Sequence, residues 1–163
     1  MSDIESLLKS GQASLNLGNP KEALVFYQKV LDQDPHNLEA LLKKGNIFGK
    51  FGRFDEAIIC YDGVLLQEKE NILALLNKGL CHHNLVQYDT AIECFDIVLK
   101  IKPENTTALY NKASSLIKSS KIKEGLELLS QVIKSDFSFK AKAKFDIDFI
   151  NIRNLNEFKE ITI

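Results

Sequence analysis

The fold is decided by residues 41–64, which read LLKKGNIFGKFGRFDEAIICYDGV. Small or apolar residues recur there at intervals of three or four, on both sides of a turn at Gly52-Arg53. These residues are Leu41, Gly45, Phe48, Ala57, Tyr61 and Val64. Such spacing places side chains on one buried face of an α-helix. The stretch therefore predicts two helices joined by a short turn.

The whole pattern repeats every 34 residues. Five registers keep this interval: Leu7, Leu41, Leu75 and Leu109; Gly11, Gly45, Gly79 and Ala113; Ala23, Ala57, Ala91 and Gly125; Tyr27, Tyr61, Phe95 and Leu129; Val30, Val64, Val98 and Val132. Agreement of five registers over four units predicts a helical repeat. A small residue such as Gly45 or Ala57 lets the two helices of a pair approach closely, while Tyr61 fills the space beside them.

This pattern resembles the tetratricopeptide repeat, whose period is 34 residues. The resemblance implies an all-α fold, a right-handed α-solenoid of four helix-turn-helix units over residues 1–139. The units are expected at about 4–37, 38–71, 72–105 and 106–139. Prolines typical of the family close two of them, at Pro35 and Pro103, whereas Lys69 and Phe137 stand at the other two positions.

Residues 140–163 break the period and predict C-terminal capping helices. A solenoid end left bare would present an apolar patch. The tail residues expected to cover the fourth pair are Phe145, Phe149, Ile152, Phe158 and Ile161.

Composition and charge narrow the classes of partner. With 21 basic and 22 acidic residues, the net charge of −1 gives no electrostatic bias, so we expect no nucleic-acid partner. No apolar run approaches the roughly 20 residues that span a bilayer, and the N-terminus lacks the basic residues of a secretory signal. Three cysteines without a CxxC spacing argue against disulfides. These features predict a cytoplasmic protein with no membrane association.

No pattern in the sequence predicts catalysis, a metal site or a cofactor. Cys81-His82-His83 is the one cluster of potential ligands, and consecutive helical residues point about 100° apart, so they do not converge on one ion. The glycines of residues 45–52 lie near Lys50 but lack the GK[ST] ending of a phosphate loop. We therefore predict a protein that is not an enzyme.

In the family that the repeat resembles, first helices line a concave groove that binds partners. The helical stripe beside the buried positions then predicts the partner-binding residues. They are Gln12, Asn16, Lys43, Asn46, Lys50, Asn77, Leu80, Asn84, Tyr110, Asn111, Ser114 and Lys118. Asn in a helix interior costs roughly 0.5 kcal/mol relative to Ala. A side-chain amide offers both a donor and an acceptor, so a row of them suits the backbone of an extended peptide. The alternative interpretation is that an Asn-rich chain simply tolerates Asn on solvated faces.

The resulting hypothesis is a protein-interaction module or adaptor that binds an extended peptide or partner segment in the groove. One subfamily binds carboxylate tails of chaperones, and Asn46 and Asn77 match its asparagines. However, Leu42, Thr107 and Asn111 stand where that subfamily has basic residues. The alternative function is a self-assembling scaffold, a homo-oligomer formed through end-to-end or groove-to-tail contacts. The sequence does not identify the partner.

Overall fold

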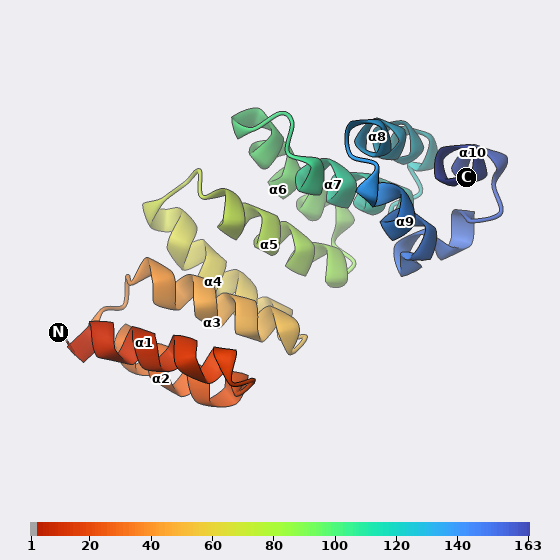
Figure 1. Cartoon of the computed structure of the whole chain (residues 1–163). Helices are drawn as coiled ribbons and strands as arrows, with labels where there is room; N and C mark the ends of the chain where they lie inside the picture. The colour runs from red at the N-terminus through yellow and green to blue at the C-terminus, as the bar shows by residue number, and fades with distance from the viewer. Residues whose placement is uncertain (1–2) are drawn as a thin grey trace. The chain divides into compact units, whose positions relative to one another are not determined.

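The computed structural model describes residues 3–163, and over that range every regular element is a helix (Figure 1). The helices are α1 (Asp3–Asn16), α2 (Pro20–Gln33), α3 (Leu38–Lys50), α4 (Phe54–Gln67), α5 (Ile72–Asn84), α6 (Tyr88–Ile101), α7 (Thr106–Lys118), α8 (Ile122–Ser135), α9 (Ser138–Phe145), the 3₁₀ helix η1 (Ile147–Ile152) and α10 (Asn156–Thr162). Helices α3, α5 and α7 begin at Leu38, Ile72 and Thr106. α9 begins at Ser138, two residues before the predicted start of the tail.

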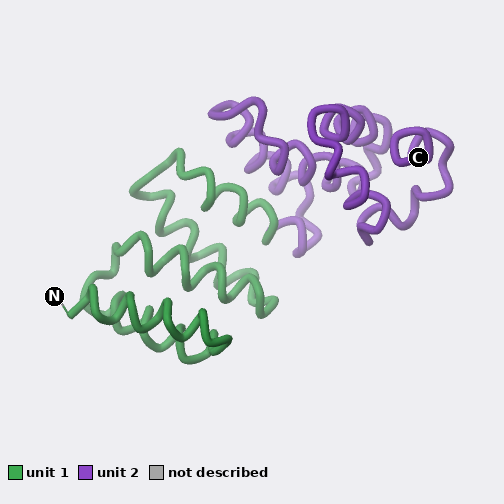
Figure 2. Tube along the Cα trace, viewed as in Figure 1, with its two compact units in different colours: residues 1–81 green, residues 82–163 purple. Residues whose placement is uncertain are grey.

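The chain forms two compact units, Met1–Cys81 (unit 1) and His82–Ile163 (unit 2) (Figure 2). Unit 1 holds α1 to α4 and most of α5, with α2 packed between α1 and α3. In unit 2, α7 packs on both α6 and α8. The residues at the centre of unit 1 are those of the repeating registers, including Ala23, Tyr27, Val30, Ala57, Tyr61 and Val64.

Glycine lets the first and second helices of a pair approach closely in unit 1. A Cβ atom built on Gly45 would lie 2.8 Å from Tyr61 Cε1, and one on Gly11 would lie 2.9 Å from Tyr27 Cε1. Both rings are buried. This confirms the prediction that a small residue lets the two helices approach closely while a large aromatic ring fills the space beside them.

The fourth pair reaches the same packing with the small residue on the other helix. A Cβ atom on Gly125 of α8 would lie 2.9 Å from the backbone oxygen of Ala113 on α7. It would also lie 2.5 Å from Ile117 Cγ1. Ala113 is tolerated at the register of Gly45 because Gly125 replaces the usual alanine opposite it.

The turn within each pair has one left-handed residue at a fixed register. Gly18 and Gly52 have φ angles of 76° and 72°. Val86 and Ser120, at the corresponding positions of the next two pairs, have φ angles of 63° and 69°. A β-branched side chain is disfavoured in this conformation, so the turn at Val86 is strained.

Asparagine caps the first helix of three successive pairs. Asn37, Asn71 and Asn105 each accept a hydrogen bond at Oδ1 from the backbone N–H three residues ahead, at distances of 2.9 to 3.1 Å. Such caps satisfy N–H groups that the helix itself leaves unpaired. Asn71 keeps this capping role before α5, although Lys69 stands where the family usually has proline.

The tail covers the fourth pair within unit 2. The 3₁₀ helix η1 packs on α7, and α10 packs on α8 and α9. Phe149, Ile152 and Phe158 are at most 3% exposed, as predicted, and Ile161 is half-buried. The prediction for Phe145 is wrong, because its side chain is 78% exposed. Phe145 ends α9, and the chain then turns at Asp146 into η1, which presents Phe149 to the core instead.

Candidate partner-binding faces

The first helices of unit 1 present a row of mainly polar side chains, which we call the unit 1 face. Its members among the predicted residues are Gln12, Asn16, Lys43, Asn46, Lys50, Asn77 and Leu80. Lys43 Nζ donates to Gln12 Oε1 at 2.6 Å, which links α3 to α1. Gln12 Nε2 in turn donates to Asn16 Oδ1 at 2.8 Å.

Asn46 is the centre of the unit 1 face. Its Oδ1 atom accepts from Asn77 Nδ2 at 2.9 Å and from Tyr61 Oη at 2.8 Å. Burial raises the pKa of Tyr61 well above its usual range, so the phenol keeps the proton that it donates. The two donors fix the orientation of the Asn46 amide. Its NH₂ group and the Asn77 carbonyl oxygen are bonded to no other side chain within residues 3–163, which leaves donors and an acceptor for a ligand.

The corresponding hydroxyl in the first pair is different. Tyr27 Oη is buried without a hydrogen-bond partner in the described part of the chain. Gln12 stands at the register of Asn46, but it bonds to Lys43 and Asn16 instead. An amide oriented by a buried tyrosine hydroxyl therefore occurs at Asn46 and not at Gln12.

In unit 2 the predicted groove residues of α7 lie beneath the tail. Tyr110, Asn111 and Ser114 are only 2%, 8% and 3% exposed. Tyr110 Oη donates to Asp146 Oδ2 at 2.6 Å, and Ser114 Oγ donates to Asp148 Oδ2 at 2.6 Å. The structure thus groups Tyr110 and Ser114 with the carboxylates of Asp146, which caps η1, and Asp148, which lies within η1. The other predicted residues of unit 2, Asn84 and Lys118, are exposed.

His83 completes the contact between α7 and the tail. Its Nδ1 atom lies 2.8 Å from Ser115 Oγ, and its Nε2 atom lies 3.2 Å from Asp148 Oδ2. The Ser115 hydroxyl also donates to the carbonyl of Asn111 at 2.9 Å. The hydrogen bond from His83 is the main cause that holds the pKa of Asp148 below its usual range, with Ser114 and Lys118 also lowering it against the effect of burial.

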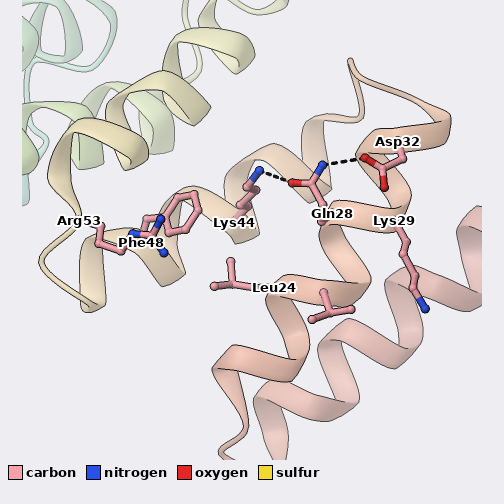
Figure 3. Close-up of a pocket in the computed structure, with 8 residues that line it drawn as sticks. Leu24, Gln28, Lys29, Asp32, Lys44, Phe48 and Arg53 are labelled. Carbon is pink, nitrogen blue, oxygen red and sulfur yellow. Dashed lines mark hydrogen bonds between the residues drawn. The ribbon is translucent and has the colours of Figure 1, made fainter.

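A separate cleft of about 430 Å³ lies between α2 and α3 in unit 1 (Figure 3). It is lined by Leu24, Val25, Gln28, Lys29, Asp32, Lys44, Phe48 and Arg53, none of which belongs to the predicted groove. Lys44 Nζ donates to Gln28 Oε1 at 2.6 Å, and Gln28 Nε2 donates to Asp32 Oδ1 at 2.8 Å (Figure 3). These polar groups bond to one another, so they join α2 to α3 rather than offering an anchor to a ligand.

The cysteine and histidine residues form no metal centre in the described range. Cys60, Cys81 and Cys94 are buried and form no disulfide within the described range, and burial raises the pKa of the Cys81 thiol to about 11. No group of three or more His, Cys, Asp or Glu side chains within residues 3–163 is placed to hold a metal ion. His82 Nδ1 is paired with Gln87 Oε1 at 2.6 Å instead.

Two family models match the sequence. One, described as tetratricopeptide repeat, matches residues 15–78. The other, described as anaphase-promoting complex, cyclosome, subunit 3, matches residues 52–132. No curated protein matches the chain significantly by sequence.

Solved structures give the same fold. MamA from Desulfovibrio magneticus RS-1 is 20% identical, with a TM-score of 0.85 over 99% of this chain and 90% of that one. A tetratricopeptide repeat protein from Parabacteroides merdae is 21% identical, with a TM-score of 0.86 over 97% of this chain and 62% of that one. The tetratricopeptide repeat domain of Arabidopsis OM64 is 23% identical, with a TM-score of 0.66 over 71% of this chain and 95% of that one.

The fold is therefore the predicted all-α solenoid of helix pairs, the class of repeat protein that presents surfaces for binding other proteins. The chain belongs to the tetratricopeptide repeat family. Families of this fold are generally non-catalytic interaction modules, which supports a general role in protein interaction or scaffolding. Within residues 3–163, no helix combines the length and the apolar character needed to cross a bilayer. The cytoplasmic location stays a prediction.

Proposed function

We propose that this protein is an interaction module that binds an extended segment of a partner protein along the unit 1 face. The observation that supports this function is the fixed amide pair of Asn46 and Asn77, whose remaining donors and acceptor match the alternating C=O and N–H groups of a peptide backbone. Because backbone groups are common to all sequences, this pair contributes affinity, and neighbouring side chains contribute selectivity.

The lysines give the unit 1 face its selectivity for charge. Lys43 and Lys50 lie on the same helix as Asn46, and Lys50 is exposed at its C-terminal end. Leu80, which is 36% exposed, adds an apolar contact at the next unit. This set favours a segment of mixed polar and apolar character with some negative charge.

The test is a selection of peptides from a display library of disordered protein segments, followed by binding measurements with purified variants. The Asn46→Ala/Asn77→Ala variant should bind the selected peptides about fivefold more weakly, since two neutral hydrogen bonds contribute about 1 kcal/mol together at the lower end of their range. A matched control is Asn19→Ala/Asn154→Ala, which removes two exposed amides elsewhere and should change affinity less than twofold. Peptides that bind the Asn46→Ala/Asn77→Ala variant undiminished would refute the proposal.

A second candidate function is self-assembly, in which the tail of one copy docks on a first-helix face of another. A tail from another copy would meet the same hydroxyl donors, Tyr110 and Ser114, that Asp146 and Asp148 meet within one copy. Sedimentation equilibrium over a hundredfold range of concentration tests this function. A constant monomer mass across that range would rule it out.

A further inference from the structure

The segment from Asp146 to Phe149 contacts the first-helix residues of unit 2 in the manner of a bound peptide. Asp146 accepts from Tyr110, and Asp148 accepts from Ser114. Phe149 is fully buried and meets the Tyr110 ring edge-on, with ring centroids 5.7 Å apart. Three side chains within four residues therefore supply the anchors.

The groups that meet these carboxylates are donors or cations. Tyr110 and Ser114 offer hydroxyl protons, and His83 faces the same Asp148 oxygen as Ser114 does. Lys118 adds a positive potential that favours the ionised form of Asp148. We call His83, Tyr110, Ser114 and Lys118 the unit 2 face. Its chemistry differs from that of the amide pair on the unit 1 face, because donors and cations select carboxylates.

Alternate side chains of the tail remain outside the contact. Ile147 and Ile150 are 74% and 54% exposed, whereas Phe149 and Ile152 are buried. The backbone carbonyl of Asp146 is held by Arg153 Nη2 at 2.8 Å, and Asp146 Oδ1 accepts from the backbone N–H of Asp148. Hydrogen bonds within the tail therefore hold this segment in place, so that one side packs on α7 and the other faces solvent.

We propose that the unit 2 face recognises a partner segment with two aspartates one residue apart followed by phenylalanine, and that residues 146–149 are an internal occupant that such a segment displaces. The proposal rests on the proposed function, in that first-helix faces bind partner segments. It adds the chemistry of the partner and the event that must precede its binding.

A separate partner protein is the occupant favoured over a second copy of this chain. Each copy already holds its own tail through the contacts at Tyr110 and Ser114. Exchange between two copies would make the same contacts again and lose the freedom of one molecule, so it gains nothing. A separate partner loses the same freedom on binding, but it can offset that loss with further contacts outside this face, which the exchange of identical tails does not add by itself.

The internal occupant sets how strongly a free segment binds. A tethered segment acts at an effective concentration of about 1 mM, so a free peptide with an intrinsic Kd near 1 μM should appear about a thousandfold weaker. Weakening the tail should then strengthen binding of the free peptide. Weakening the unit 2 face should weaken it. These opposite signs separate a binding site from a merely structural contact.

The experiment titrates the full chain, labelled for NMR, with a synthetic peptide of residues 144–153, KFDIDFINIR. The Asp146→Asn/Asp148→Asn chain keeps the shape of the tail and an acceptor at each position but loses both charges. It should bind the peptide about tenfold more tightly than the wild-type chain, with shifts at His83 and Ser114. Adding Ser114→Ala to that chain should reverse the gain. The control peptide KFNINFINIR should bind about tenfold more weakly.

Equal binding by the wild-type and Asp146→Asn/Asp148→Asn chains would overturn the proposal, as would equal binding of the two peptides. If circular dichroism shows that the double variant is unfolded, Asp148→Asn alone gives the same test with one charge removed. A tail-exchanged dimer of the wild-type chain in sedimentation would assign the site to a second copy and overturn the choice of partner. The Asn46→Ala/Asn77→Ala variant should bind KFDIDFINIR normally, so failure of the proposed function is distinguishable from failure here.

Discussion

Replacing Gly45 with alanine tests whether close packing in unit 1 controls both its stability and its partner-binding face. The added Cβ atom would lie 2.8 Å from Tyr61 Cε1 and 3.1 Å from Cys60 Cβ. Alanine is intrinsically better than glycine in a helix by about 1 kcal/mol. Overpacking a filled core costs about 1–3 kcal/mol. We therefore expect Gly45→Ala to lower the free energy of unfolding by about 1 kcal/mol.

Gly49→Ala is the matched control on the same helix. A Cβ atom there meets only Tyr61 Oη, at 3.9 Å, which is an ordinary contact. This variant should gain up to about 1 kcal/mol from helix propensity, so the two variants should differ by about 2 kcal/mol. Urea denaturation followed by circular dichroism measures the difference, provided that the slopes of the transitions agree.

The same substitution should also affect the unit 1 face. Tyr61 must move to accommodate the new methyl group, and its hydroxyl is one of the two donors that fix Asn46. Peptide binding should weaken in Gly45→Ala and stay unchanged in Gly49→Ala. A Gly45→Ala protein as stable as Gly49→Ala would show that the helices separate at little cost, which refutes the packing argument.

Three further predictions concern single sites. Val86→Gly should raise the free energy of unfolding by about 1 kcal/mol, since it relieves a β-branched residue at positive φ whose side chain is 68% exposed; chemical denaturation measures this, and a loss of stability would contradict it. Tyr61→Phe should lower the free energy of unfolding by about 1 kcal/mol because it removes a hydrogen bond, whereas Tyr27→Phe should be neutral or stabilising because the Tyr27 hydroxyl is buried without a partner in the described part of the chain. Equal changes in the melting temperature of the two variants would contradict this. The pKa of Asp148 is lowered on folding, so the contribution of its ionised carboxylate to the free energy of unfolding is complete well above the ordinary pKa of 3.8 and is lost as the pH falls through the folded pKa. The difference in free energy of unfolding between the wild type and Asp148→Asn should therefore be largest near pH 7 and shrink below pH 3.8. A difference that stays constant with pH would refute this prediction.

The helix pairs were predictable because burial alone produces their sequence pattern. A 34-residue period in five registers specifies where each helix begins, which face it buries and where the backbones meet, as Gly45 and Tyr61 show. The strained turns were not predictable in the same way. Val86 and Ser120 carry the left-handed conformation because the geometry of the repeat imposes it, and neither residue type indicates a positive φ angle.

The tail was predicted in outline and not in detail. Its apolar residues indicated a cap, but which of them turns inward depends on where α9 ends and η1 begins, so Phe145 was assigned to the wrong side. The contact of Tyr110 with Asp146 joins residues 36 positions apart, outside the 34-residue period. No periodic signal marks such a contact, and the sequence therefore did not indicate that Tyr110 and Ser114, which were predicted to line the groove, lie beneath the tail.

One helical register shows how a shared fold supports different binding chemistries. Asn46 and Ser114 occupy equivalent positions two units apart. Asn46 presents an amide oriented by Tyr61 and Asn77, which suits neutral backbone groups. Ser114 presents a hydroxyl beside His83, which suits a carboxylate. Because the backbone at this register is the same in both, the side chain decides which kind of segment is bound. A structural likeness at 20% identity shows the fold alone, so the choice of partner must be established on this chain itself.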